Sequence, residues 1–370
     1  MKLLTVLSLL STSVLTSALH NDLQQPISND HAFDSGFDDD FDASLAAKSH
    51  PKITSEHIPS DPVDSIPPIG FGTWLLKNED DMQNTTDSVA YALQTGYRHI
   101  DCAAAYRNQK WVGKGIKAGL HTAGLERKDI WVTSKLWNDH HGSADPSLVE
   151  QEFNETLADL GVGYLDLYLM HWPVGEDPKN HNTSFDYIFT WSRMTKLLDT
   201  GRVRYIGISN FAPEELRRLM ASSDVKPYAH QFELHPYLQQ GWWLAWHKRL
   251  GVVVTAYSPL ANSNPTYKGR VKEMPPPLLN NTVITEIAKE RSCTPAQVAL
   301  SWNMFRGAVV IPKSKHERYI EENLGSLNCA LLYPDYPKIE ALGKKYLTRM
   351  NNPGEGWGVH LFKGLDGSEQ

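Results

Sequence analysis

Hydrophobic and polar positions alternate regularly along residues 66–350: a short apolar run, a turn, then a longer segment with apolar residues on one helical face. Short apolar runs predict buried β-strands, and apolar residues three and four apart predict amphipathic helices. The clearest helix is Leu148–Leu160, where Val149, Phe153, Leu157 and Leu160 fall on one face. We therefore expect strands and helices to alternate throughout this region.

The pattern predicts eight strands, and a helical pattern follows each of them. The strands are expected at Phe71–Trp74, Arg98–Cys102, Ile130–Lys135, Leu165–His171, Tyr205–Ser209, Ala229–Glu233, Val252–Ser258 and Ala308–Ile311. Besides Leu148–Leu160, helices are expected at Ser88–Gln94, Lys110–Lys117, Phe189–Leu198, Pro213–Ala221, Trp242–Arg249, Asn281–Lys289 and Lys315–Asn323. Pro213 and Pro295 support helix starts, because proline is favoured in the first helical turn.

Eight strand–helix units in about 285 residues match a (β/α)8 TIM barrel, whose usual length is about 250 residues. The rival is a doubly wound open sheet, which needs a G-x-G-x-x-G turn directly after a strand. Gly113-Lys114-Gly115 lies inside a helical pattern, which is the wrong context. We expect a barrel over residues 66–350, followed by a C-terminal loop and tail over residues 351–370.

Polar residues gather where the predicted strands end. They are Asp101, Lys135, His171, Ser209, Asn210, Gln231, Tyr257, Ser258 and Lys313, and Tyr106 follows Asp101 by five residues. In a barrel these strand ends meet at one mouth, where the active sites of such folds lie. A barrel end used only for packing would not need so many polar groups, so the mouth is the predicted active site.

Seven short motifs at these strand ends match the sequence pattern of a known enzyme family. They are Gly96–Asp101 with Tyr106, Thr133–Trp137, Met170–Pro173, Gly207–Phe211, Gln231–Tyr237, Ala256–Leu260 and Ile311–Ser314. Together they resemble the aldo-keto reductase superfamily, in particular aldose and aldehyde reductases, over residues 68–350. The resemblance implies a (β/α)8 barrel and an oxidoreductase that reduces aldehydes or ketones to alcohols with a nicotinamide cofactor.

The resemblance also implies a catalytic tetrad of Asp101, Tyr106, Lys135 and His171. Its chemistry is consistent with these residue types, because hydride reduction of a carbonyl needs a proton donor to the developing alkoxide. A tyrosine donates more readily when an adjacent ammonium stabilises its phenolate. Asp101 would keep Lys135 charged and oriented, and His171 would hydrogen-bond the carbonyl oxygen. No metal is required.

The cofactor residues implied by the resemblance span four strand ends and the last predicted helix. They are Ser209, Asn210, Gln231, Tyr257, Ser258, Leu260, Lys313, Ser314, Arg318, Glu322 and Asn323. Tyr257 would stack on the nicotinamide, and Lys313 with Ser314 would meet the adenosine 2′-phosphate at a helix N-terminus. This favours NADP(H). NAD(H) stays open because Tyr319 stands where the family usually has arginine.

The substrate pocket would use His171, three tryptophans, Trp74, Trp137 and Trp172, and the C-terminal loop around Asn351–Phe362. Such aromatic rings suit an aromatic aldehyde, an aldose or a glyceraldehyde-like carbonyl. Residues 353–362 are interpreted either as a flexible lid anchored by Trp357 or as a loop packed on the side of the barrel.

Two further positions depart from the family pattern. Gln109 replaces a common glutamate, which we expect to change local packing rather than chemistry. The segment Asp61–Pro68 stands in place of the N-terminal hairpin that usually plugs the barrel floor.

The N-terminus predicts export. Lys2, the apolar stretch Leu3–Leu15 and the small residues Thr16-Ser17-Ala18 form a signal-peptide pattern, assigned to residues 1–18. Residues 19–65 are rich in Asp, Ser and Pro, and we expect them to be a disordered acidic extension. We therefore expect the protein to enter the secretory pathway, to be secreted and to have no membrane association after signal cleavage. Without a functional signal peptide, the alternative location is the cytoplasm. N-glycosylation sequons occur at Asn84, Asn154, Asn182 and Asn280.

Charge and cysteine content narrow the remaining possibilities. The chain of 370 residues has a formal net charge of −7, residues 21–65 carry −8, and residues 66–370 sum to zero. A neutral barrel lacks the basic face that nucleic-acid binding needs. Three cysteines exclude a disulfide-based scaffold. Cys102 is expected to be buried, and whether Cys293 pairs with Cys329 is left open.

Three other functional classes fit the sequence less well than a carbonyl reductase. Tyr106 and Lys110 have the Tyr-x-x-x-Lys spacing of short-chain dehydrogenases, but the glycine-rich turn of that class is missing. A barrel glycoside hydrolase would need two carboxylates at the mouth. A binding barrel without turnover would not need the whole tetrad. We expect a small carbonyl compound as the partner, and a monomer or homodimer.

Overall fold

The computed structural model describes residue 58 and residues 61–74, 79–141, 145–175 and 186–368. The predicted signal peptide, nearly all of the acidic extension and the sequon at Asn182 lie outside the described residues. Among the described helices, none is both long and apolar enough to cross a membrane.

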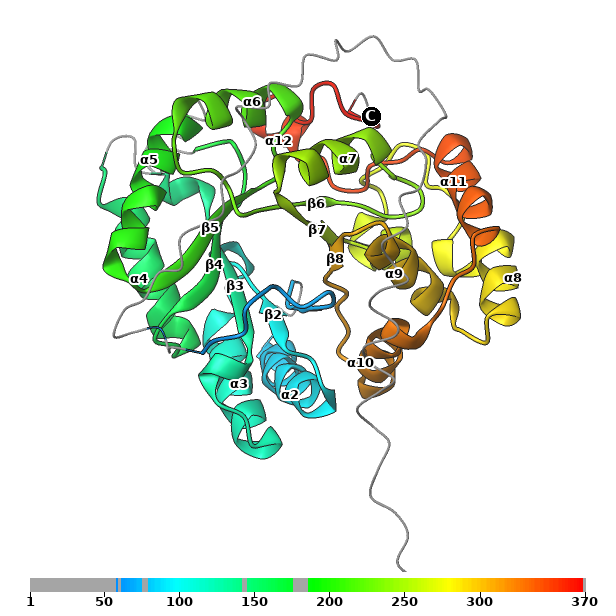
Figure 1. Cartoon of the computed structure of the whole chain (residues 1–370), viewed down its shortest axis with the longest axis horizontal. Coiled ribbons are helices and arrows are strands. Elements are labelled where there is room, and N and C mark those ends of the chain that lie inside the picture. Colours follow the sequence, from blue (N-terminus) through cyan, green and yellow to red (C-terminus); the bar gives the residue numbers. More distant parts are fainter. Residues whose placement is uncertain (1–57, 59–60, 75–78, 142–144, 176–185, 369–370) are drawn as a thin grey trace, which may run out of the picture. The chain divides into compact units, whose positions relative to one another are not determined.

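Eight parallel strands follow one another in sequence order around a single curled sheet (Figure 1). They are β1 (Phe71–Gly72), β2 (His99–Asp101), β3 (Trp131–Leu136), β4 (Leu165–Met170), β5 (Val203–Ser209), β6 (Ala229–Glu233), β7 (Val253–Tyr257) and β8 (Val309–Val310). Closure is provided by a parallel bridge between Ile69 and Val310 and by a 2.8 Å hydrogen bond from the Gly70 amide to the Val310 carbonyl. The predicted (β/α)8 barrel is therefore confirmed.

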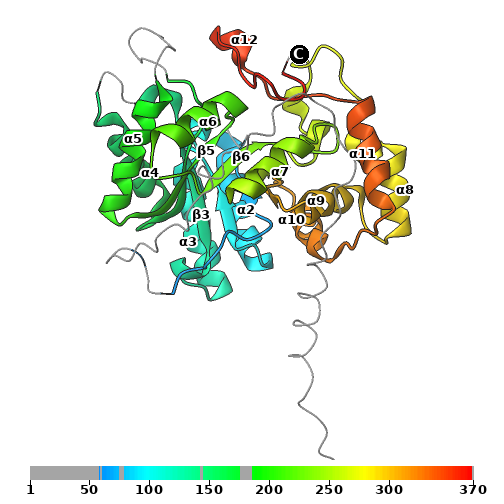
Figure 2. The ribbon, with the colours of Figure 1, turned by 45° about the horizontal axis from the view of Figure 1, so that its top comes forward.

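Helices surround the sheet (Figure 2). They are α2 (Glu79–Thr95), α3 (Gln109–Ala123), α4 (Leu148–Leu160), α5 (Tyr187–Leu197), α6 (Pro213–Ser222), α7 (Gly241–Leu250), α8 (Thr282–Glu290), α9 (Pro295–Phe305), α10 (Glu317–Leu324), α11 (Asp335–Lys345) and α12 (Gly354–Trp357). Helix α4 has the predicted bounds, whereas α2 begins nine residues earlier than predicted. Helix α9 follows α8 before β8, and α11 was not predicted.

Local sequence explains where several of these helices begin and pack. Helix α9 starts with a capping box in which Thr294 and Gln297 bond each other's backbone amides, and Pro295 occupies its first turn. In α3, a Cβ at Gly113 would lie 2.5 Å from the carbonyl oxygen of Leu160. Gly113 therefore lets α3 approach the end of α4, and it takes no part in a nucleotide-binding loop.

The segment Asp61–Pro68 packs against the N-terminal end of the barrel. The Val63 amide donates to the Lys128 carbonyl at 3.0 Å, and Arg204 donates to the Val63 carbonyl at 2.8 Å. Ile66 joins an apolar cluster with Trp131 and residues of neighbouring strands. Residues 61–65 are thus part of the barrel's packing, and their assignment to a disordered extension was wrong.

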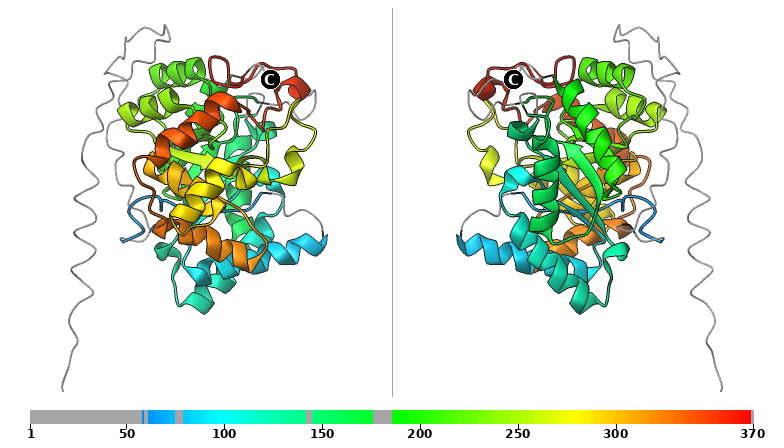
Figure 3. Two further views of the ribbon diagram at one scale, coloured as in Figure 1. Left: turned by 90° about the vertical axis from the view of Figure 1, so that its right-hand side faces the viewer. Right: turned by 90° about the vertical axis from the view of Figure 1, so that its left-hand side faces the viewer.

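The chain after α11 returns to the barrel mouth. Figure 3 shows this C-terminal segment, in red, at one end of the barrel. Its anchor is the buried carboxylate of Glu233 at the end of β6, which accepts hydrogen bonds from the amides of Met350 at 2.6 Å and Asn351 at 2.8 Å. The segment that follows, including α12, is thereby fixed above the strand ends.

Candidate active site

A cavity of about 440 Å³ opens at the C-terminal ends of the strands. Its lining includes most of the predicted site residues: Trp74, Asp101, Tyr106, Trp137, His171, Trp172, Asn210, Gln231, Tyr257, Ser258, Leu260 and Lys313. Parallel strands of a barrel deliver their ends to one mouth, so residues from positions 74 to 313 meet there. The predicted location of the site at the barrel mouth agrees with this geometry.

The four tetrad residues come from β2, the turn after it, β3 and the end of β4. The Lys135 ammonium donates to Oδ1 of Asp101 at 2.6 Å, to the Cys102 carbonyl at 2.9 Å and to the Tyr106 hydroxyl at 3.3 Å. The side chains of Lys135 and Asp101 are 0% and 1% exposed. The ring of His171 meets the ring of Tyr106 edge-on, with 5.8 Å between centroids.

Burial controls the protonation of these groups. It raises the pKa of Tyr106 to about 12, although the Lys135 charge opposes the shift, so the phenol is protonated at neutral pH. Burial also lowers the pKa of Lys135, but Asp101 and Tyr106 outweigh it and the ammonium is retained. The pKa of His171 lies well below its usual range because of burial and the Lys135 charge, so its imidazole is neutral.

A hydrogen-bonded network lies beside the tetrad on β5, β6 and β7. Asn210 has φ of 64°, a left-handed conformation that asparagine tolerates. Its amide donates to the His171 carbonyl at 3.0 Å and accepts from the Tyr257 hydroxyl at 2.7 Å. Gln231 donates to the second oxygen of Asp101 at 2.7 Å. Gln231 lies two residues before the end of β6, so the prediction of a strand-end position was slightly wrong.

The remaining predicted cofactor residues are more dispersed. Lys313 lines the cavity, whereas Ser209 is buried, lies outside the cavity lining and donates to the Gln231 carbonyl. Ser314 accepts a hydrogen bond from the His316 amide at 3.0 Å. Arg318, Glu322 and Asn323 lie on α10, outside the cavity lining.

The predicted substrate tryptophans converge on the C-terminal segment. The ring of Trp357 lies edge-on to Trp172 at 5.0 Å and to Trp137 at 6.1 Å. Trp137 also meets His171 edge-on at 5.2 Å. Residues around Trp357 therefore cover the mouth, in agreement with the interpretation of Trp357 as an anchor and against packing on the side of the barrel.

Two predictions about polar and sulfur-containing residues are answered directly. Gln109 is buried and bridges Ser134 on β3 to Thr156 on α4, with distances of 2.6 and 3.2 Å, which is a packing role. Cys102 is buried as expected. Cys293 and Cys329 form a disulfide with a Cα–Cα distance of 5.8 Å, which resolves the pairing left open by the sequence.

The sequence did not predict two cavity residues. Tyr267 and Arg270 line the cavity from the long connection between β7 and α8. They lie in irregular chain away from any strand end, and no spacing rule marks them. Asn351, at the start of the C-terminal loop expected to contribute to the substrate pocket, also lines the cavity and donates to the Tyr257 hydroxyl at 3.4 Å.

Comparisons with known proteins agree with this geometry. The model of the aldo/keto reductase family matches residues 68–344. An uncharacterized oxidoreductase of Schizosaccharomyces pombe is 43% identical over 291 residues, which cover 75% of this chain and 85% of that protein. A glycerol 2-dehydrogenase (NADP(+)) of Saccharomyces cerevisiae is 39% identical over 279 residues, covering 70% and 82%.

A solved structure is also similar. The Bombyx mori aldo-keto reductase, determined in complex with NADP, superposes with a TM-score of 0.73 at 31% identity and covers 80% of this chain and 94% of that one. The resemblance first seen in the strand-end motifs is thus confirmed, and the chain belongs to the aldo-keto reductase family.

Proposed function

We propose that this oxidoreductase reduces an aldehyde or ketone with NADPH, with Tyr106 as the proton donor. The observation that carries the proposal is the continuous chain of contacts from Asp101 through the Lys135 ammonium to the Tyr106 hydroxyl, at 2.6 and 3.3 Å. That chain ends in the cavity beside a neutral His171. A substrate oxygen placed between the two side chains would receive hydrogen bonds from both.

The residues have separate tasks in this reaction. When bound, NADPH supplies hydride to the carbonyl carbon. Tyr106 gives its proton to the carbonyl oxygen, and the phenolate that remains lies 3.3 Å from the ammonium of Lys135. Asp101 keeps Lys135 charged through a buried ion pair. His171, whose imidazole is uncharged, orients the substrate oxygen by donating a hydrogen bond from its single N–H group.

The cavity fits a nicotinamide dinucleotide. Tyr257 presents an aromatic ring beside the amides of Asn210 and Gln231, and Lys313 supplies positive charge farther along the same cavity. Arg270 lines that cavity too and adds a second cation. Two cations favour the additional phosphate of NADP(H) over NAD(H). The NADP complex of the silkworm relative supports the same choice.

The substrate class follows from the aromatic mouth. Trp74, Trp137, Trp172 and Trp357 lie around the cavity and present flat apolar rings to whatever enters. Such rings pack against an aromatic aldehyde or the apolar face of an aldose or glyceraldehyde-like carbonyl. We propose aldehydes of these kinds as substrates.

One experiment tests the proposal. Purified protein should consume NADPH with a panel of generic aromatic and sugar aldehydes, followed by absorbance. Tyr106→Phe should lower kcat by roughly 10²–10⁴-fold, because it removes the proton donor. Tyr333→Phe, at a residue that is 79% exposed, is the matched control.

The outcomes are distinct. A wild-type protein that consumes no NADPH across the panel would contradict the reductase function. NADPH binding without turnover would instead favour a nicotinamide-nucleotide-binding barrel with no catalytic role.

We also propose that the protein enters the secretory pathway and is secreted. The predicted signal peptide, residues 1–18, carries this proposal, and the disulfide between Cys293 and Cys329 supports it, since disulfides persist in oxidising compartments. Asn84, Asn154 and Asn280 are exposed and chemically available for glycosylation. Mature N-termini and glycan content of secreted and cell-associated fractions, compared by mass spectrometry, test it. An intact Met1 in an unglycosylated intracellular protein would overturn it.

A further inference from the structure

The backbone of Trp137 has an unusual hydrogen-bond partner. Strand β3 pairs with β4 up to Leu136 opposite Met170, so the peptide of Trp137 lies just beyond the ladder. Its N–H group donates instead to Oε2 of Glu152, on α4, at 2.6 Å. A side-chain carboxylate therefore takes the place of a strand carbonyl two residues after Lys135.

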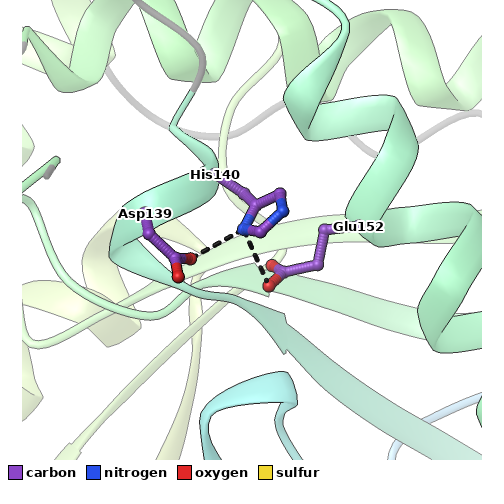
Figure 4. A group of neighbouring side chains, drawn as sticks. All are labelled: Asp139, His140 and Glu152. Atoms are coloured by element: carbon purple, nitrogen blue, oxygen red, sulfur yellow. Dashed lines mark hydrogen bonds and ion pairs between the residues drawn. The ribbon is translucent and has the colours of Figure 1, made fainter. Parts of the chain in front are cut away.

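Glu152 belongs to a small acid–base cluster outside the cavity (Figure 4). Nδ1 of His140 lies 2.7 Å from Oδ1 of Asp139 and 3.5 Å from Oε1 of Glu152. The side chain of Glu152 is only 7% exposed, whereas those of His140 and Asp139 are 23% and 39% exposed. One oxygen of the buried carboxylate thus meets the Trp137 amide, and the other faces the imidazole.

The neighbours of this carboxylate come from three elements. His140 and Asp139 lie in the turn after β3, Glu155 lies on the same helix, and Tyr168 lies on β4. Burial raises the pKa of Glu152 to about 7 against the opposing effect of His140. The hydrogen bond that His140 donates to the Asp139 carboxylate raises the pKa of His140, so the imidazole is charged more readily than usual.

The cluster connects to the pocket through Trp137. The ring of Trp137 lines the cavity, 5.2 Å from the His171 ring and 6.1 Å from that of Trp357. None of Asp139, His140 and Glu152 lines that cavity. A group that fixes the peptide of Trp137 therefore also fixes the position of its indole relative to the rings of His171 and Trp357.

We propose that Glu152 is a positioning residue for substrate recognition: its carboxylate holds the Trp137 peptide and thereby places the indole that shapes the substrate pocket. This inference rests on the proposed function, because it assigns Trp137 to the pocket of a carbonyl reductase. Hydrogen bonds to an ionised acceptor are stronger than those to a neutral one. Trp137 is therefore held more firmly as the carboxylate loses its proton.

A buried glutamate of this kind has a cost for folding. Its folded-state pKa of about 7 lies above the ordinary value of 4.5, so the folded protein binds the proton more tightly than the unfolded chain. Stability contributed by the protonated form is present below the unfolded pKa and is lost as pH rises through 7. A glutamine at position 152 would avoid this cost. The presence of a glutamate is explained if its charge positions Trp137 in the pocket.

The test uses two substitutions at one position. Glu152→Ala removes the acceptor, and Glu152→Gln keeps an acceptor but removes the charge. Glu150→Gln, at an exposed residue on the same helix, is the matched control. KM and kcat are measured from pH 5.5 to 8.5 with a bulky aromatic and a small aliphatic aldehyde, together with the dissociation constant of NADPH.

The expected result is a selective loss of substrate affinity. Glu152→Ala should raise KM for the aromatic aldehyde roughly ten-fold, the equivalent of one lost charge-assisted hydrogen bond. KM for the small aldehyde, kcat and NADPH affinity should change less than about two-fold. The wild-type KM for the aromatic aldehyde should fall as pH rises through about 7. In Glu152→Gln that pH dependence should disappear, and its thermal midpoint at pH 8.5 should exceed that of the wild type.

Other outcomes would overturn the inference. If both Glu152 variants keep the wild-type KM for the aromatic aldehyde, Glu152 has no positioning role. If KM rises for both aldehydes while kcat and NADPH affinity fall, the residue is merely structural. A wild-type protein with no turnover would refute the proposed function instead, and the two failures are thereby separated.

Discussion

Two groups of residues at the cavity follow different physical principles. In the tetrad region, Asp101 and Lys135 are almost fully buried and bonded to each other at 2.6 Å. In the cation region, Lys313 and Arg270 line the cavity from exposed positions. The tetrad region is a fixed network of short contacts, and the cation region is a pair of charges that water can reach.

The difference teaches where substitution is tolerated. A buried charge without its partner is strongly unfavourable, so each member of the tetrad network depends on the others. An exposed cation attracts a phosphate from several positions, because the attraction is not tied to one geometry. In this sequence Tyr319 replaces the family's usual arginine at a predicted cofactor position, whereas all four tetrad residues are kept. This is consistent with greater tolerance of substitution among the exposed cations.

The largest effect is expected for the buried tetrad residues. Lys135→Met should lower kcat roughly 10³-fold, because the phenolate of Tyr106 loses its ammonium partner. It should also destabilise the fold by about 3–5 kcal/mol, since Asp101 is left as an unpaired buried charge. Steady-state kinetics and urea unfolding measure the two effects. The double variant Asp101→Asn/Lys135→Met is expected to recover stability but not activity; if it recovers neither, burial of an unpaired charge is not the cause.

The next largest effect concerns the covalent link in the second half of the barrel. The disulfide between Cys293 and Cys329 joins residues with a sequence separation of 36, and the segment between them includes Lys313 and helix α10. Closing a loop of this length is expected to contribute about 3–4 kcal/mol. The variant Cys293→Ala/Cys329→Ala should lose this amount in urea unfolding. Reductant should destabilise the wild type to the same level and leave the variant unchanged; equal stability without reductant would contradict the bond's contribution.

The smallest effect is expected for the exposed cations. Lys313→Ala should weaken NADPH binding about ten-fold at low salt, because one charged contact to a phosphate is lost. The loss should shrink at high salt, and NADH binding should change little. Lys248→Ala, on α7 away from the cavity, provides the control. An equal loss for both cofactors, measured by fluorescence titration, would show that Lys313 does not discriminate between them.

Much of this site could be predicted because its residues lie at strand ends. Asp101, Lys135, His171 and Tyr257 each occupy the last two positions of a strand or the residue after it. Periodicity locates strands, and the barrel rule then brings their ends together. Tyr267 and Arg270 escaped prediction because irregular chain has no period, so nothing local says which loop residue faces the cavity.

Burial likewise explains which expectation about chemistry needed revision. The sequence suggested that Lys135 would make the Tyr106 phenol more acidic, and its charge does act in that direction. Complete burial outweighs it and raises the phenol's pKa to about 12. The extent of desolvation depends on everything packed around the ring, which a motif does not contain.

The sequence by itself determined the strand–helix alternation, the barrel and the polar residues gathered at its mouth, because these follow from short-range periodicity and from residues placed at the ends of strands. Only the tertiary structure decided the contacts between distant segments: the Cys293–Cys329 bond, the packing of Val63 and Ile66 beneath the barrel, and the Glu152 carboxylate at the Trp137 amide. Such contacts depend on the distance between elements after packing, and no local pattern specifies that distance.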